Sequence, residues 1–111
     1  MNQNIKVSKF GGSSMKDTKA MYRSAQVVKT HQTQMVIVSA TYGTTNQLLD
    51  LIDLSLNSDW RSIDESISKI RKRHIELCGE LNGSKELFIS IHALIDELTA
   101  LCTGVFYLKE C

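Results

Sequence analysis

A short glycine-containing segment near the amino terminus has the residue types needed to bind phosphate. It runs Lys9-Phe10-Gly11-Gly12-Ser13-Ser14, directly after an apolar stretch. Two adjacent glycines let the backbone pass close to a ligand and expose amide donors that can hold phosphate oxygens. Lys9 adds a compact ammonium that can offset charge on a phosphoryl group in transfer, and the serines add hydrogen-bond donors. The same spacing suits an ordinary strand-to-helix turn with a solvated Lys9, and spacing alone favours that interpretation.

A second polar segment, residues 39–46, could bind a carboxylate. It reads Ser-Ala-Thr-Tyr-Gly-Thr-Thr-Asn and gathers five hydroxyls and one side-chain amide around a predicted helix start. The amino-terminal end of a helix attracts anions. Helix capping by Thr44 or Thr45 would account for one or two of these hydroxyls, and this alternative stays open. Two neighbouring anion sites would suit phosphoryl transfer between two bound substrates.

The hydrophobic pattern places both segments at the ends of strands. Residues 5–10 predict a first strand, and a helix capped by Asp17 follows through about Lys29. The uninterrupted apolar run Met35-Val36-Ile37-Val38 predicts a second strand, buried on both faces of a parallel sheet. A right-handed βαβ unit brings the carboxyl ends of its strands to one edge, where such sheets bind ligands.

The rest of the chain is predicted to be helical. Capping-box spacing opens two helices, at Thr44 with Gln47 and at Ser62 with Glu65. The second should end near Asn82-Gly83, where Ser84 caps a third. The apolar stripe of this third helix is expected to lie in the core: Leu87, Phe88, Ile91, Leu94, Ile95, Leu98, Leu101, Cys102 and Val105. The fold class is therefore α/β, as one domain with a βαβα half that carries both ligand loops (1–58) and a helical half (59–111).

Composition argues against several function classes. Thirteen basic and twelve acidic residues leave a net charge of +1, so neither nucleic acid nor an anionic membrane is an expected partner. No signal peptide and no membrane span is expected, and a cytoplasmic location follows. The basic run Arg71-Lys72-Arg73 is expected to be a solvated helix face. Widely spaced cysteines and histidines predict reduced thiols and no metal site: Cys78, Cys102 and Cys111, and His31, His74 and His92.

The two loops together resemble the opening of the aspartokinases, in the amino-acid kinase superfamily. These enzymes typically read Lys-Phe-Gly-Gly-Thr/Ser-Ser and then a Ser-Ala loop that ends in Thr-Asn. The resemblance implies that Lys9, Phe10, Gly11, Gly12 and Ser13 meet the phosphates of ATP, supplied as its Mg²⁺ complex, with Lys9 catalytic. It also implies that the aspartate pocket is formed by a second set: Ser39, Ala40, Thr45 and Asn46. Thr45 is the favoured direct contact, while Tyr42 stands where many relatives have smaller residues.

The implied reaction is transfer of the ATP γ-phosphoryl group to the β-carboxylate of L-aspartate, the first step toward lysine, threonine and methionine. Aspartokinases continue with a Gly-Glu segment, an arginine for the substrate carboxylate and the adenine-binding strands. The chain is thus expected to be the amino-terminal part of a catalytic domain, with little or no turnover alone. The alternatives are a non-catalytic remnant or interaction module, which could form a homo-oligomer or join a longer kinase subunit, and a kinase of the superfamily with another substrate.

Overall fold

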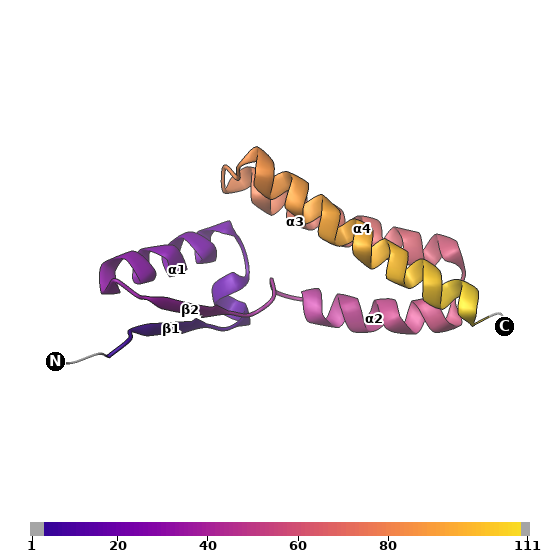
Figure 1. The fold of residues 1–111 in the computed structure, drawn as a ribbon, viewed down its shortest axis with the longest axis horizontal. Helices are drawn as coiled ribbons and strands as arrows, with labels where there is room; N and C mark the ends of the chain where they lie inside the picture. Colours follow the sequence, from indigo (N-terminus) through magenta and orange to yellow (C-terminus); the bar gives the residue numbers. More distant parts are fainter. Residues whose placement is uncertain (1–3, 110–111) are drawn as a thin grey trace. The chain divides into compact units, whose positions relative to one another are not determined.

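The computed structural model describes residues 4–109, and the chain divides into two compact units, Met1–Thr45 and Asn46–Cys111. The described part of the first unit is a small α/β structure, and that of the second is helical (Figure 1). The predicted α/β class, with a short parallel sheet followed by a helical region, is confirmed. The boundary between the units falls in the first turn of a helix. The sequence analysis placed the whole of this helix in the half that carries the ligand loops (1–58).

The first unit is a parallel βαβ arrangement. Its elements follow in the order β1 (Val7–Phe10), η1 (Gly12–Met15), α1 (Thr18–His31) and β2 (Met35–Val38). Val7 pairs with Met35 and Phe10 with Val38, so the two strands end at the same edge. β1 begins two residues later than predicted and leaves Ile5 outside it.

The caps of α1 explain its bounds. The Asp17 carboxylate accepts a hydrogen bond from the Ala20 amide at 2.8 Å, as its predicted role as amino-terminal cap requires. The helix runs two residues past Lys29, and Gln32 then turns the chain in the left-handed region, at φ 50°. The Gln32 amide donates to the Lys29 carbonyl at 3.3 Å, which closes the last turn.

The prediction that β2 is buried on both faces is wrong. All four of its apolar side chains are exposed, with exposed fractions of 50% for Met35, 44% for Val36, 46% for Ile37 and 58% for Val38. The apolar run did predict the strand. Its burial required further layers and strands, and the described residues form a sheet of only two strands.

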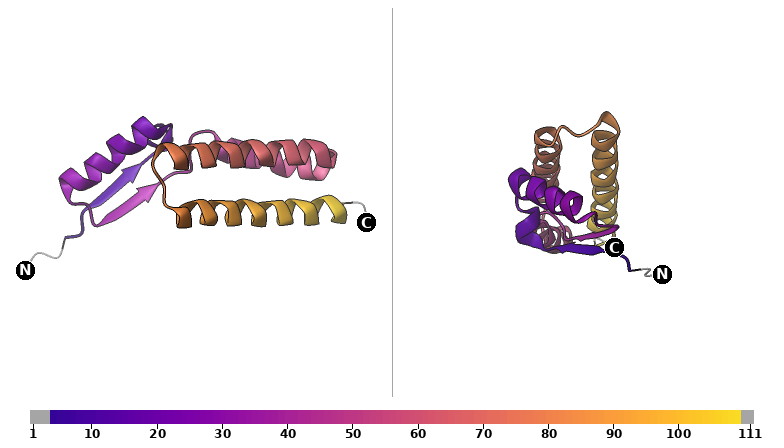
Figure 2. Two further views of the ribbon diagram at one scale, coloured as in Figure 1. Left: turned by 90° about the horizontal axis from the view of Figure 1, so that it is seen from above. Right: turned by 90° about the vertical axis from the view of Figure 1, so that its left-hand side faces the viewer.

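The second unit packs helices around an apolar core. Its helices are α2 (Thr44–Asn57, inside the unit from Asn46), α3 (Trp60–Glu80) and α4 (Lys85–Leu108). Figure 2 shows α3 and α4 running side by side in opposite directions. The buried side chains of the core come from all three: Leu51, Ile63, Ile67, Ile70, Ile95 and Cys102. Near one end of this pair the rings of Trp60 and Phe106 lie 5.7 Å apart.

Two of the four predicted helix caps are corrected. Asp59, rather than Ser62, caps α3, because its carboxylate accepts from the Ser62 amide at 2.9 Å. This bond, followed by the one from the Ser62 hydroxyl, holds the pKa of Asp59 below its usual value. Thr44 is the first residue of α2, not the residue before it. Ser84 caps α4 as predicted and accepts from the Leu87 amide at 3.1 Å.

The apolar stripe of α4 is only partly in the core. Ile95 and Cys102 are buried, but four predicted core residues are exposed: Leu87, Leu94, Leu101 and Val105. Leu101 and Val105 line an apolar groove of about 330 Å³ between α2 and α4. By length and composition α4 could also cross a membrane, contrary to the prediction of no such segment, although core helices of soluble proteins pass the same test.

An ion pair joins α3 to α4. Arg71 donates to the Asp96 carboxylate at 2.6 Å and lies 2.8 Å from Nδ1 of His92. The run of basic residues 71–73 was expected to be a solvated helix face, but Arg71 also joins the two helices through these contacts. Cys78 and Cys102 are buried free thiols, as expected, while Cys111 lies outside the described residues.

Candidate functional site

The first loop leaves β1 with an open approach to its backbone. Gly11 is extended, at φ −82° and ψ −173°, and η1 begins at Gly12. A side-chain carbon built on Gly11 would have no atom within 4 Å, so a ligand could come close to the main chain there. The Ser14 amide donates back to the Gly11 carbonyl at 3.0 Å and fixes the turn. Neither Gly11 nor Gly12 has a positive φ. The feature that distinguishes Gly11 is therefore the empty space beside its backbone.

Lys9 lies one residue before the end of β1. It pairs in register with Ile37 and its side chain is exposed. Lys9 takes part in neither the ion pair of Arg61 with Glu65 nor that of Arg71 with Asp96. Its ammonium is therefore available to an anionic ligand at the carboxyl edge of the sheet.

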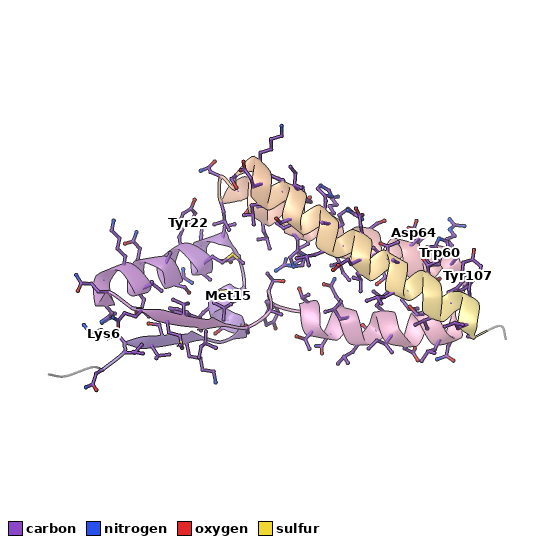
Figure 3. All side chains as sticks on the ribbon, in the orientation of Figure 1. Lys6, Met15, Tyr22, Trp60, Asp64 and Tyr107 are labelled. Atoms are coloured by element: carbon purple, nitrogen blue, oxygen red, sulfur yellow. The ribbon has the colours of Figure 1, made fainter. Side chains whose placement is uncertain are left out.

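The second loop begins beside the first. The Ser39 amide donates to the Phe10 carbonyl at 3.1 Å, so the residues that open the two loops are hydrogen-bonded neighbours. Farther along, the Tyr42 amide donates to the carbonyl of Met15, which is labelled in Figure 3, at 3.2 Å. An atom of the Tyr42 ring lies 3.9 Å from where a side-chain carbon on Gly12 would stand. The predicted meeting of both loops at one sheet edge is thus present within the first unit.

The hydroxyls of the second loop fall into two groups. Ser39 donates to the Ala40 carbonyl at 2.9 Å, and the hydroxyls of Thr41 and buried Thr44 are hydrogen-bonded to each other. Tyr42 and Thr45 are exposed, and their hydroxyls make no hydrogen bond within residues 4–109. The loop therefore keeps these two hydroxyls available to a ligand and uses the other three to hold its own shape.

The remaining predicted pocket residues lie at the two ends of this loop. Ala40 is exposed and immediately follows Ser39. Gly43 adopts a φ of +82°, a conformation that L residues rarely adopt, and lets the chain turn into α2. Asn46 is exposed on α2 and is the first residue of the second unit.

Ser24 on α1 supports the first loop, a role that the sequence pattern did not predict. Its buried hydroxyl lies 3.2 Å from the Ser14 carbonyl and 3.0 Å from the Ala20 carbonyl. It thereby connects η1 to α1. The available signal was a small polar residue between the apolar positions Met21 and Val28 of an amphipathic helix.

A shallow polar groove lies between the first loop and α1. Its volume is about 450 Å³. Ser13 lines it from the loop and Arg23 from the helix, with the following other residues: Phe10, Ser14, Ala20, Ser24 and Val27. Arg23 was also missed, because its position beside the loop depends on how α1 packs. The groove adds a second cation to the loop that carries Lys9.

No group of three or more possible metal-ligating side chains occurs among residues 4–109. Two of the cations of this region are the ammonium of Lys9 and the guanidinium of Arg23, which lines the groove. The arrangement can therefore bind anions through backbone amides, hydroxyls and two cations. It is suited to holding phosphate and carboxylate groups rather than to nucleophilic catalysis by a protein side chain.

Comparison with known proteins identifies the family. The model of the amino acid kinase family matches residues 4–104. The chain belongs to the amino acid kinase family. The bifunctional aspartokinase/homoserine dehydrogenase 2 of Escherichia coli is 33% identical over 95 residues, which are 84% of this chain and 12% of that protein.

A solved member of this kinase family has the same fold. E. coli aspartokinase III, crystallised with aspartate and ADP in its R-state, matches with a TM-score of 0.79 and 30% identity. The match covers 93% of this chain and 23% of that one. The resemblance to aspartokinases is thereby confirmed, and the chain spans less than a quarter of the length of either relative.

Proposed function

We propose that this chain is the ligand-loop part of an aspartokinase catalytic domain, which transfers the γ-phosphoryl group of ATP to the β-carboxylate of L-aspartate in the cytoplasm. The observation that carries the proposal is the hydrogen bond from the Ser39 amide to the Phe10 carbonyl. It sets a loop suited to phosphate beside a loop suited to carboxylate, as transfer between two bound substrates requires. The match to an aspartokinase solved with aspartate and ADP supports the choice of substrates.

In the proposed reaction the protein supplies position and charge. The backbone of Phe10, Gly11 and Gly12 and the hydroxyl of Ser13 would hold phosphate oxygens, and Lys9 would offset the charge on the γ-phosphoryl group as it moves. Magnesium would arrive with ATP as part of the co-substrate and help neutralise its phosphates.

The second loop would orient the acceptor. The exposed Thr45 hydroxyl would donate to a carboxylate of aspartate, with Ser39, Ala40 and Asn46 forming the pocket around it. The β-carboxylate then attacks the γ-phosphorus in line, the bond from phosphorus to the bridging oxygen breaks, and ADP leaves. No acid-base pair is needed, because the attacking oxygen is already an anion.

The complete enzyme is proposed to act in a biosynthetic route to lysine and threonine. The chain alone is proposed to bind these ligands with little or no turnover. It spans 23% of the aspartokinase III chain, so groups that complete the catalytic centre would have to come from additional sequence. Formation of aspartyl phosphate by residues 1–111 alone, trapped as the hydroxamate, would contradict this.

Isothermal titration tests the loop assignment. Mg-ATP and aspartate are titrated separately into the folded chain and into Lys9→Ala. Lys29→Ala is the matched control, because it removes the same charge at the far end of α1. We expect ATP binding that Lys9→Ala weakens at least tenfold and Lys29→Ala leaves within about twofold. Equal effects of the two substitutions, or no heat from either ligand, would reject the phosphate-loop role.

A further inference from the structure

Tyr42 belongs to the second loop but is attached to the first. Its amide donates to the carbonyl of Met15, the last residue of η1, at 3.2 Å. The exposed fraction of Tyr42 is 63%, and its hydroxyl makes no hydrogen bond within residues 4–109. Tyr42 is therefore neither a core residue nor a helix cap, and its side chain is open to a ligand.

A tight turn fixes the position of Tyr42. The Thr44 amide donates to the Thr41 carbonyl at 3.0 Å, which makes Tyr42 and Gly43 the two central residues of the turn. Gly43 has a φ of 82°, as a type II turn requires at its second central residue. The hydroxyls of Thr41 and Thr44 are hydrogen-bonded to each other across the same turn. These neighbouring groups, and not the Tyr42 hydroxyl, hold the loop in shape.

The ring of Tyr42 reaches the first loop. Its Cδ2 atom lies 3.9 Å from where a side-chain carbon on Gly12 would stand, which is ordinary van der Waals contact. Gly12 is the first residue of η1, and with Gly11 it forms the part of the loop suited to phosphate. A tyrosine hydroxyl can donate a hydrogen bond. A side chain of the carboxylate-type loop thus brings a free donor to the edge of the phosphate-type loop.

We propose that Tyr42 is a further ligand-binding residue, whose hydroxyl donates to a phosphate oxygen of ATP held at Gly11 and Gly12. The inference rests on the proposed function and adds a contact that neither loop's motif predicted. The contact of the ring with Gly12 favours a phosphate oxygen over the aspartate carboxylate, for which Thr45 is the proposed donor. Lys9 offsets charge, whereas the Tyr42 hydroxyl adds a hydrogen bond without adding charge, and such bonds to anions are the stronger kind.

Isothermal titration of the chain with Mg-ATP, magnesium tripolyphosphate and aspartate tests this contact. Tyr42→Phe keeps the ring and removes only the hydroxyl. Tyr107→Phe is the matched control, because it removes the same group from a residue of α4 that is 66% exposed. We expect Tyr42→Phe to weaken binding of both phosphate ligands at least about fivefold and to leave aspartate binding within about twofold. Tyr107→Phe should leave all three unchanged, and the Gly12 and Met15 amide signals of unliganded Tyr42→Phe should match those of the parent chain.

Four results would overturn the proposal. Wild-type affinity of Tyr42→Phe for Mg-ATP, with weaker binding by Lys9→Ala, would remove the role of Tyr42 and leave the proposed function standing. Loss of aspartate binding alone would assign the hydroxyl to the acceptor. Shifted Gly12 and Met15 amide signals in unliganded Tyr42→Phe would mean that the hydroxyl acts through the shape of the loop. No binding of Mg-ATP by the folded parent chain would reject both this contact and the phosphate-loop role.

Discussion

The hydroxyl of Ser24 on α1 lies 3.2 Å from the carbonyl of Ser14 and so connects the phosphate-type loop to the helix behind it. Ser24→Ala should destabilise the first unit by about 1 kcal/mol, because a part-buried carbonyl loses its donor. Alanine's higher helix propensity offsets part of that loss. Urea unfolding followed through the amide signals of the first unit measures the change. Ser68→Ala, at an exposed position of α3, should leave those signals unaffected, and equal effects would contradict the assigned contact.

Gly83 lies where the turn between α3 and α4 leaves no room for a side chain. A carbon added there would stand 2.2 Å from Sγ of Cys78 and 3.1 Å from its carbonyl oxygen. Because the backbone oxygen moves little, Gly83→Ala should destabilise the second unit by about 1 to 3 kcal/mol. Gly104→Ala is the matched control, since nothing lies within 4 Å of the added carbon on α4. It should stabilise by up to about 1 kcal/mol. Thermal unfolding of the two variants should shift in opposite directions.

Ile63 is fully buried in the core that joins α2 to α3 and α4. Ile63→Ala should cost about 2 to 5 kcal/mol of unfolding free energy through lost burial and the cavity left behind. Ile89→Ala removes the same atoms from α4 at a side chain that is 59% exposed, and should change stability far less. Similar losses from both substitutions in denaturant titration would mean that the core is not packed as described.

Asp59 gives the helical unit a specific acid sensitivity. Its pKa is lowered below 3.8 by the hydrogen bonds from Ser62, so the folded state favours the carboxylate. The stability that the ionised Asp59 gives to the folded state is fully present above the pKa of the unfolded state. It is lost as the pH falls through the lower pKa of the folded state. Asp59→Asn keeps a cap but removes this titration, so the stability of the variant should depend less on pH as the solution is acidified below pH 3.8. Parallel pH curves for the two proteins, from urea unfolding, would exclude the capping role.

The pattern of the sequence predicted the elements well but their surroundings less well. Apolar patterns, the Asp17 cap and the placement of glycines predicted β1, α1, β2 and the meeting of the two loops, because each of these depends on residues near in sequence. The exposure of Met35 and Leu101 could not be read from their apolar character, since burial depends on what covers a face. Capping was misplaced at Ser62 because Ser62 and Asp59 both suit that role, and only the helix start decides between them.

For the candidate site, too, the residues set by local pattern were predicted and those set by packing were not. The positions of Lys9 and Ser39 followed from strands whose carboxyl ends meet, which hydrophobic patterns predict. Ser24 and Arg23 could not be recognised in advance, because their place beside the loop follows from the rotation of α1 against it. The binding roles of Lys9 and Thr45 remain predictions for the titrations above.

The close turn at Gly83 also bears on the order in which the chain folds. It joins α3 to α4 through residues 81–84 alone, so this pair can form from contacts near in sequence. The pairing of β1 with β2 must first close a longer segment, as in the bond from the Lys6 amide to the Gln34 side chain, 28 residues away. Local contacts form faster than distant ones. In a refolding experiment the amides of α3 and α4 should therefore gain protection before those of Ile37 and Ser39, making the helical pair the first stable structure on the folding path.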